Sequence, residues 1–333
     1  MVSVRILNSC ENTLAKNLLT YLYIYCIYIY IQYIITKNLK ANPRLKAEIY
    51  MMIEAKGLSK KLKNFQLENL SFTVPPGYIC GLIGQNGAGK TTLLHLLLGL
   101  YQADEGELLI DGMGYDNEEK RIHNEIGTVL TEELFDPSLT LMQNGNGYGR
   151  YYDAYDKKAM EGYLKLFGLE KSRKFGRLSK GEKLKCQFAF ALSHDAKLLI
   201  LDEPTGNFDP EFREQFFKIL KEFIADGSRS VVLATHLTED LDRMADYLIF
   251  LENGKQVFAG DIEKFRDSYR MVSGEAYKIR LLQKEKIIRM EENAYGAKTL
   301  TAHSRLNRYD RELVVAYPTI EEFMYFYGRR KEE

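Results

Sequence analysis

A glycine-rich segment, GQNGAGKTT at residues 84–92, constrains this chain more than any other feature. It fits the pattern G-x-x-x-x-G-K-[ST] and lies between a strand-like apolar run at 78–83 and a helix-like run at 93–98. In that context the glycines let backbone N–H groups turn inward around a polyphosphate, and the helix N-terminus adds positive potential. The segment therefore predicts ATP or GTP binding. A strand-to-helix turn that carries a lysine by chance is the weaker explanation.

Each position of this segment has an expected role. Lys90 is expected to reach the terminal phosphates, and the Thr91 hydroxyl is expected to bind Mg²⁺. The predicted phosphate-binding residues are Gly84, Asn86, Gly87, Ala88, Gly89, Lys90, Thr91 and Thr92. The loop alone does not distinguish a kinase, a GTPase, a helicase and a transport ATPase.

A second apolar run, KLLILDEP at 197–204, has the character of a buried strand and ends in two carboxylates. Asp202 is expected to complete the Mg²⁺ shell, through water, and Glu203 to polarise an attacking water. Acidic pairs at strand ends are often only solvated. Because this pair follows a phosphate loop, we interpret it as catalytic.

A segment between these two motifs reads RLSKGEK. Leu178, Ser179 and Gly181 match the Leu-Ser-Gly-Gly-Gln signature of the ATP-binding-cassette (ABC) family, which this chain resembles, whereas Lys180 and Glu182 depart from it. A serine hydroxyl and free N–H groups at a helix N-terminus can donate hydrogen bonds to a phosphate. The resemblance implies that Ser179, Lys180, Gly181 and Glu182 act on ATP held by a partner subunit. Ser179 can also be an N-cap, with Glu182 completing a capping box, and the two roles are compatible.

Two further segments follow in the order of this family. GNFDP at 206–210 resembles the D-loop, which implies that Asp209 organises the interface between two nucleotide sites. SVVLATH at 230–236 is a buried strand, and His236 matches the family's switch histidine, expected to contact the terminal phosphate and the attacking water. A lone histidine is more often structural, but a place at the carboxyl edge of a parallel sheet favours catalysis. The resemblance covers about 52–261.

Two positions depart from the family pattern. Where the family carries a loop glutamine that contacts the metal and the membrane subunit, this chain has Thr131, followed by Glu132 and Glu133. Either glutamate can supply a carboxylate oxygen instead, or both face solvent. Where an aromatic ring stacks on adenine in the family, the chain has Leu62, with Phe65 close by. Phe65 is a candidate for stacking on the base, and a role in the core is equally compatible.

Composition limits the classes of partner. Lysine plus arginine and aspartate plus glutamate each total 46, so no overall charge predicts nucleic-acid binding. The motif set occurs once in 333 residues, which implies that a second copy is needed. The four cysteines have neither metal-ligand spacing nor a paired framework, which indicates a reducing compartment.

The first fifty residues differ from the rest. Residues 18–35, LLTYLYIYCIYIYIQYII, carry no charge and are long enough for a short membrane anchor. Six tyrosines along its length argue against an anchor, because tyrosine prefers membrane interfaces. Alternating Tyr and Ile is also what translation of a TA repeat produces. Our hypothesis is that residues 1 to about 50 correspond to untranslated sequence upstream of the gene, and that the native start is Met51 or Met52.

The whole pattern predicts an α/β fold of the P-loop NTPase class and ABC type. We expect an ATPase domain at 52–261, with a mixed sheet core, an antiparallel β-subdomain and a helical subdomain at about 135–178 that carries the signature. An Asn-Gly hairpin is expected at 247–258. Residues 262–333 are expected to form a small α+β appendage, with a helix starting at Pro318 or Thr319.

The resemblance implies the ATP-hydrolysing subunit of a bacterial ABC transporter, most similar to exporter ATPases whose membrane subunits are separate chains. It implies ATP and Mg²⁺ as cofactors, a homodimer, a separate permease and a peripheral place on the cytoplasmic face of the membrane, with no nucleic acid. One alternative is a soluble ABC ATPase that remodels a ribosome or DNA, although such proteins tend to carry two cassettes or a long coiled-coil insertion. Another is a non-catalytic, membrane-tethered regulator, against which Glu203 and His236 count.

Overall fold

The computed structural model describes residues 51–132, 134–282, 287–302 and 312–328. Residues from Met51 onward form one compact unit. The hypothesis of an upstream extension or anchor at 1–50 and the candidate ligand Glu133 lie outside the described residues.

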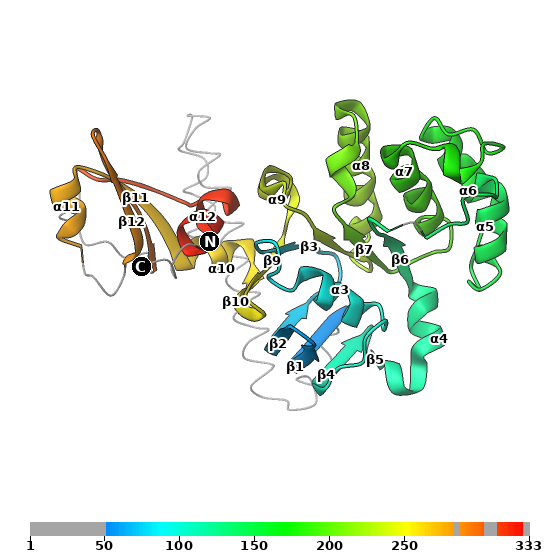
Figure 1. The fold of residues 1–333 in the computed structure, drawn as a ribbon, viewed down its shortest axis with the longest axis horizontal. Coiled ribbons are helices and arrows are strands. Elements are labelled where there is room, and N and C mark those ends of the chain that lie inside the picture. Colours follow the sequence, from blue (N-terminus) through cyan, green and yellow to red (C-terminus); the bar gives the residue numbers. More distant parts are fainter. Residues whose placement is uncertain (1–50, 133, 283–286, 303–311, 329–333) are drawn as a thin grey trace, which may run out of the picture. The chain divides into compact units, whose positions relative to one another are not determined.

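In the described part of the chain, ten strands form one mixed sheet in the order β5-β4-β1-β2-β10-β9-β3-β8-β7-β6 (Figure 1). Strands β9, β3, β8, β7 and β6 pair in parallel, and β5, β4, β1 and β2 pair antiparallel. The strands are β1 Ile53–Leu62, β2 Phe65–Val74, β3 Ile79–Ile83, β4 Glu105–Ile110, β5 Met113–Gly114, β6 Ile126–Val129, β7 Leu198–Asp202, β8 Ser230–Ala234, β9 Tyr247–Glu252 and β10 Lys255–Asp261. The expected mixed sheet with an antiparallel part is confirmed.

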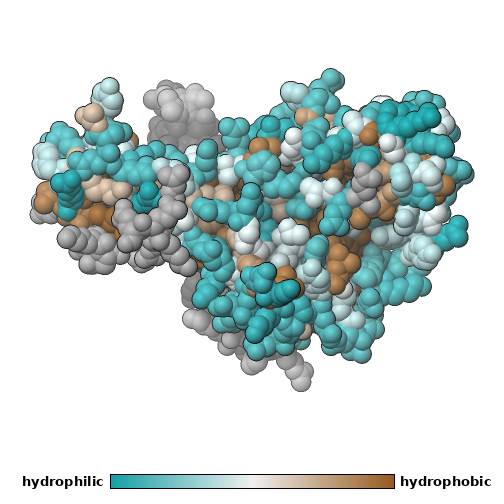
Figure 2. Space-filling model, in the orientation of Figure 1, coloured by the Kyte–Doolittle hydropathy of each residue, from teal (hydrophilic) through white to brown (hydrophobic). Residues whose placement is uncertain are grey.

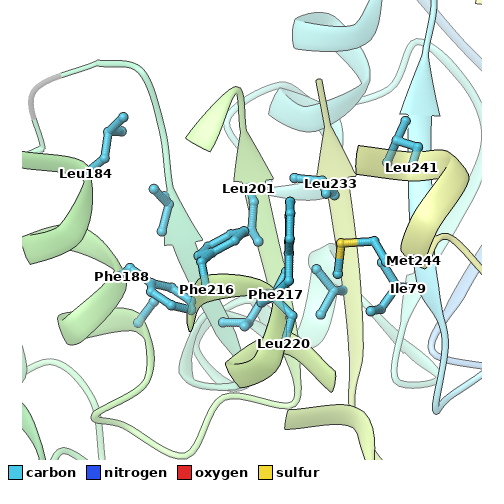
Figure 3. Packing of buried hydrophobic residues seen from close by; sticks show 14 of the residues in the cluster. Ile79, Leu184, Phe188, Leu201, Phe216, Phe217, Leu220, Leu233, Leu241 and Met244 are labelled. Atoms are coloured by element: carbon cyan, nitrogen blue, oxygen red, sulfur yellow. The ribbon is translucent and has the colours of Figure 1, made fainter. Parts of the chain in front are cut away.

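The parallel strands are buried on both faces, as their continuous apolar runs predict. One face packs on α3 (Lys90–Leu97), which contributes Leu93 and Leu97 to that core. The other face is covered by α7 (Lys180–Ala191), α8 (Pro210–Ile224) and α9 (Thr238–Met244). Figure 3 shows Phe216, Phe217 and Leu220 of α8 directed at the strand residues Leu201 and Leu233.

A helical region is inserted between β6 and β7. It contains α5 (Leu141–Gly149), α6 (Lys157–Leu166) and a short 3-10 turn at Phe175–Arg177, and it leads into α7. Thr140 and Gln143 form a capping box at the start of α5, and Asp156 caps α6. Most of α7 is buried, including Leu184, Cys186, Phe188, Ala189 and Phe190.

The chain after β10 forms a second, antiparallel sheet in the order β12-β13-β11-β14, with helices around it. Its elements are α10 Ile262–Ser268, β11 Tyr269–Gly274, α11 Ala276–Arg280, β12 Ile287–Asn293, β13 Gly296–Ala302, β14 Val314–Ala316 and α12 Ile320–Gly328. Thr319 and Glu322 bond reciprocally at the start of α12, so the expected helix start is confirmed.

The appendage shares a core with the ATPase part. Phe323 of α12 lies edge-on to Phe250 of β9, with ring centroids 5.2 Å apart, and Phe265 of α10 contacts Phe258 of β10. The Asp242 carboxylate on α9 accepts a hydrogen bond from the Ile320 N–H at 3.1 Å. The two sheets are therefore joined by aromatic packing and by a helix cap.

The predicted hairpin is also present. Strands β9 and β10 pair antiparallel around Asn253 and Gly254, whose φ values of 47° and 77° are those of a tight hairpin turn. The Gly254 N–H donates to the Ala88 carbonyl at 3.0 Å, so this turn supports the glycine-rich loop.

Candidate functional site

The glycine-rich loop leaves β3 and enters α3 directly, as its sequence context predicts. Gly84, Gly87 and Gly89 have φ of 155°, 79° and 110°, the range that favours glycine. A Cβ on Gly84 would lie 2.5 Å from the Leu251 carbonyl oxygen, and one on Gly89 would lie 2.5 Å from Leu67. The residues predicted to bind phosphate form one continuous turn and first helical turn: Gly84, Asn86, Gly87, Ala88, Gly89, Lys90, Thr91 and Thr92.

The Lys90 ammonium is folded back over this loop. Nζ donates to the Gly84 carbonyl at 2.7 Å and lies 3.5 Å from the Gln85 carbonyl. Burial lowers the pKa of Lys90, and the negative charges of Glu203 and Asp202 oppose that change. Both carboxylates therefore act electrostatically on this ammonium.

The acidic pair stands where β7 ends. Burial raises the pKa of Asp202 above its usual range, the neighbouring Glu203 charge raises it further, and Lys90 lowers it. Glu203 has left-handed backbone angles, φ 48° and ψ 43°, and its N–H donates to the Ala234 carbonyl at 2.8 Å. Two carboxylates with one nearby ammonium leave a surplus of negative charge, which suits a divalent cation held by Asp202 and the Thr91 hydroxyl.

His236 meets Glu203 at this edge. It follows β8, and its Nδ1 lies 2.6 Å from Glu203 Oε2. The His236 backbone N–H donates to the same oxygen at 3.2 Å. The structure thus brings together two residues that the sequence separates by more than thirty positions.

The signature segment starts α7. The Ser179 hydroxyl accepts from the Glu182 N–H at 3.2 Å, and the Glu182 carboxylate accepts from the Ser179 N–H at 2.8 Å, so the expected capping box is confirmed. Glu182 also pairs with Arg173, whose Nη1 lies 2.6 Å away. A Cβ on Gly181 would lie 2.4 Å from the Asn207 carbonyl, which explains the glycine, and Lys180 is exposed.

The D-loop candidate lies beside the signature helix. Asp209 caps α8 by accepting from the Phe212 N–H at 2.9 Å. It also accepts from Lys185 Nζ of α7 at 3.1 Å. Asp209 therefore links the two helices within this chain.

The loop after β6 carries the Thr131 departure. Thr131 and Glu132 line a cavity of about 240 Å³ with Lys180, Lys183 and Leu184 of α7. The Glu132 charge is among the causes that raise the pKa of Asp202, so this glutamate lies near the acidic pair.

Phe65 begins β2 and is partly buried. Its ring approaches Gly89, where an added Cβ would lie 2.8 Å from the ring, and it packs against the core cluster that contains Leu67. The structure therefore brings Phe65 to the loop and gives it core contacts at the same time.

Sequence reasoning missed a buried ionic network behind the D-loop. Asp240 of α9 has 0% exposure and accepts from the Thr205 hydroxyl at 2.9 Å and from Arg213 Nε at 3.0 Å. Thr205 lies in the 3-10 turn Pro204–Asn207 that follows Glu203. No local pattern marks Asp240, because its partners come from two other elements.

A larger groove lies next to the loop after β6. It has a volume of about 670 Å³ and is lined between α4 (Tyr115–Glu125), β6, α5 and α7. Leu100, Leu134 and Tyr151 on its walls are exposed. Figure 2 shows hydrophobic residues gathered on this face in the region of β6. Burial lowers the pKa of His194, which lines the groove, to about 4, so its imidazole is neutral at neutral pH, whereas Glu119 and Lys120 add charged side chains to the lining.

Comparison with known proteins agrees with this geometry. The family described as ABC transporter matches residues 67–206. The Nod factor export ATP-binding protein I of Ralstonia nicotianae is 33% identical over 215 residues, 63% of this chain and 67% of that protein. The protein of the same name in Rhizobium sp. (strain N33) is 33% identical over 62% of this chain and 70% of its own length. This chain belongs to the ABC transporter ATP-binding family.

Solved structures of ABC ATPases have the same fold. An ATP-binding subunit of an ABC transporter matches with a TM-score of 0.61 at 25% identity, over 65% of this chain and 92% of its own. A dimeric bacterial ABC transporter cassette matches with a TM-score of 0.58 at 26% identity, over 63% of this chain and 99% of its own. The ABC-type mixed sheet and the prediction of an ATP-binding ATPase are confirmed.

Subunits of this family dimerise and work with membrane components. Among the residues that the structure describes, no helix is both long and apolar enough to cross a membrane.

Proposed function

We propose that this chain hydrolyses ATP as one half of a homodimer and drives a separate membrane permease that exports its cargo. The observation that carries the proposal is the convergence of Lys90, Glu203 and His236 at one edge of the parallel sheet, where the neighbouring strands β3, β8 and β7 end beside the glycine-rich loop. The similarity to proteins named as export ATP-binding proteins supports the direction of transport.

The residues fit an in-line attack of water on the γ-phosphate. Lys90 and the loop N–H groups would hold the phosphates and offset their charge. Glu203 would accept the proton of the attacking water, and its contact with His236 would hold it in position. The left-handed backbone of Glu203 turns this side chain out of the strand direction, toward His236.

Mg²⁺ is proposed as the cofactor. Thr91 and Asp202 would hold it, and the surplus of negative charge at the acidic pair supports this assignment. The ion, when bound, would neutralise charge on the phosphates. Thr131 and Glu132 stand at the loop where the family has its glutamine, and Glu132 is close enough to Asp202 to influence its pKa.

The second half of each ATP site would come from the partner copy. Ser179, Lys180, Gly181 and Glu182 begin a 12-residue helix whose N-terminus favours an anion. Asp209, which caps α8 next to this helix, would lie in the interface between the two copies. Phe65 is proposed to support the adenine ring at the edge of the loop.

We propose that the 670 Å³ groove takes a segment of the permease. Its exposed apolar residues Leu100, Leu134 and Tyr151 suit the apolar side chains of a protein segment, and Glu119 and Lys120 can contact polar groups of the same segment. This docking would hold the ATPase on the cytoplasmic face of the membrane.

We also propose the domain boundaries. The ATPase domain would be 52–261, with the signature on a helical subdomain at about 135–178, and 262–333 would be an accessory region.

The proposal is tested on the purified full chain. With Mg²⁺ and ATP it should release phosphate and shift reversibly from monomer to dimer in sedimentation velocity experiments. Lys90→Ala should weaken ATP binding about tenfold or more, because it removes a charged contact to the phosphates. ATP hydrolysis by protein that stays monomeric throughout would contradict the proposal.

A further inference from the structure

Gln187 is a buried amide in the middle of α7, with 2% of its surface exposed. Its Oε1 accepts from the Leu130 N–H at 2.8 Å, and its Nε2 donates to the Glu132 carbonyl at 3.0 Å. A single side chain is therefore hydrogen-bonded to the loop after β6 on both sides of Thr131. Its neighbours on α7, Cys186 and Phe188, are buried apolar residues.

The chemistry of this contact requires an amide. One end of the side chain must accept a hydrogen bond and the other must donate one, and glutamine does both. An ionised glutamate of the same length has no donor, and methionine has neither a donor nor a strong acceptor. Without Gln187, the Leu130 N–H would lose its partner in a buried place, which is unfavourable.

Gln187 also stands between two cavities. It lines the 670 Å³ groove, and it lines the 240 Å³ cavity formed by Thr131, Glu132 and the first turns of α7. Eight residues before it, the signature residue Ser179 caps the N-terminus of the same helix. The amide therefore connects the groove, the loop near the acidic pair and the signature helix.

We propose that Gln187 is a positioning residue that makes the loop 130–132 and α7 move as one body, so that the groove and the signature respond together. The inference rests on the proposed function, because it concerns the approach of a signature to the ATP of a second copy. A monomer needs only its own glycine-rich loop to bind ATP, whereas the dimer also needs α7 in the right place. Loss of the amide should weaken the dimer and spare the monomer.

The test compares Gln187→Met and Gln187→Glu in a Glu203→Gln background, in which the ATP-bound dimer is expected to persist. We expect the dimer dissociation constant with ATP to rise about tenfold, while ATP binding by the monomer stays within about twofold. Hydrogen exchange of the Leu130 amide should accelerate in Gln187→Met, because the carbonyl that accepts its hydrogen bond is lost. Gln187→Glu keeps an acceptor oxygen for Leu130 and removes the donor to the Glu132 carbonyl.

Ser193→Ala is the matched control. Ser193 is 2% exposed just after α7, and its hydroxyl donates only to the Phe190 carbonyl within the same turn, at 2.7 Å. This variant removes a buried hydrogen bond without disturbing the loop, so dimer affinity should stay as in the parent. A Gln187 variant that lowers the melting temperature and leaves dimer affinity unchanged would overturn the proposal.

A measurement on the unsubstituted chain covers the case in which the variants fail to fold. Exchange in the segments 126–132 and 180–191 should change together when ATP is added. A change in one segment without the other would refute the coupling. Absence of ATP-driven dimerisation in the unsubstituted chain would instead refute the proposed function, so the two failures are distinguishable.

Discussion

The two ends of the candidate site differ in how complete they are within one chain. At the glycine-rich loop, Lys90 lies in the field of Asp202 and Glu203, and Glu203 already contacts His236. At the signature, the Ser179 hydroxyl is occupied by its own helix N-terminus, and Lys180 is exposed. The first end brings an ammonium, two carboxylates and a histidine together within one chain, whereas the second is a capped helix N-terminus with an exposed lysine. This difference is what a shared, two-copy site requires.

The strongest test of this contrast is Glu203→Gln. The amide keeps the size of the side chain and cannot accept the proton of water, so turnover should fall about a hundredfold or more. ATP binding should be retained, because the glycine-rich loop is unchanged. Phosphate release and equilibrium binding of ATP measure the two quantities. His236 contacts the same carboxylate, so His236→Asn provides a comparison in which this contact is changed and the carboxylate of Glu203 is kept. Turnover at the unsubstituted rate would remove Glu203 from its proposed role.

A smaller effect is expected at the exposed end. Ser179→Arg puts a bulky cation where the partner's phosphate is proposed to dock, and ATPase activity should fall about tenfold or more, while monomers still bind ATP. Because the change also removes an N-cap, which contributes about 1 kcal/mol to stability, Ser179→Asn is the control that keeps a capping side chain. Equal activity of both variants, at concentrations where the dimer forms, would argue against a signature acting between copies.

The smallest effect concerns the loop that lies near the first end. Glu132→Ala should raise the Mg²⁺ concentration for half-maximal ATPase activity about twofold to threefold, because it removes a charge that influences Asp202. Thr131→Gln in the same background should restore part of the loss, since it supplies an amide oxygen. The corresponding change at Glu133 provides the comparison. Unchanged Mg²⁺ dependence in both alanine variants would mean that these glutamates are only solvated.

The sequence predicts the local structure at both ends of the site because the signals are local. A glycine needed at a positive φ, a lysine beside it and carboxylates at the end of an apolar strand can each be read from neighbouring residues. The capping box of Ser179 and Glu182 and the Asn253-Gly254 hairpin are local in the same sense, and both are present.

Contacts between distant elements could not be predicted in this way. Asp240 and Gln187 are polar residues in helices, where the usual expectation is solvent exposure. Each is buried because its partners come from other parts of the chain: Thr205 and Arg213 for Asp240, and the loop 130–132 for Gln187. The docking of α12 on β9 likewise depends on a pairing of Phe250 with Phe323 that no periodicity indicates.

The left-handed backbone of Glu203 affects the thermal stability of the protein as well as the position of its side chain. A residue with a side chain at φ 48° has a conformational cost of about 1 kcal/mol, which asparagine or glycine would largely relieve. Selection for thermostability alone would thus favour replacement of the proposed base. A protein that retains glutamate at position 203 keeps this conformational cost together with the proposed base. Thermal stability and catalytic rate would therefore favour different residues at this position.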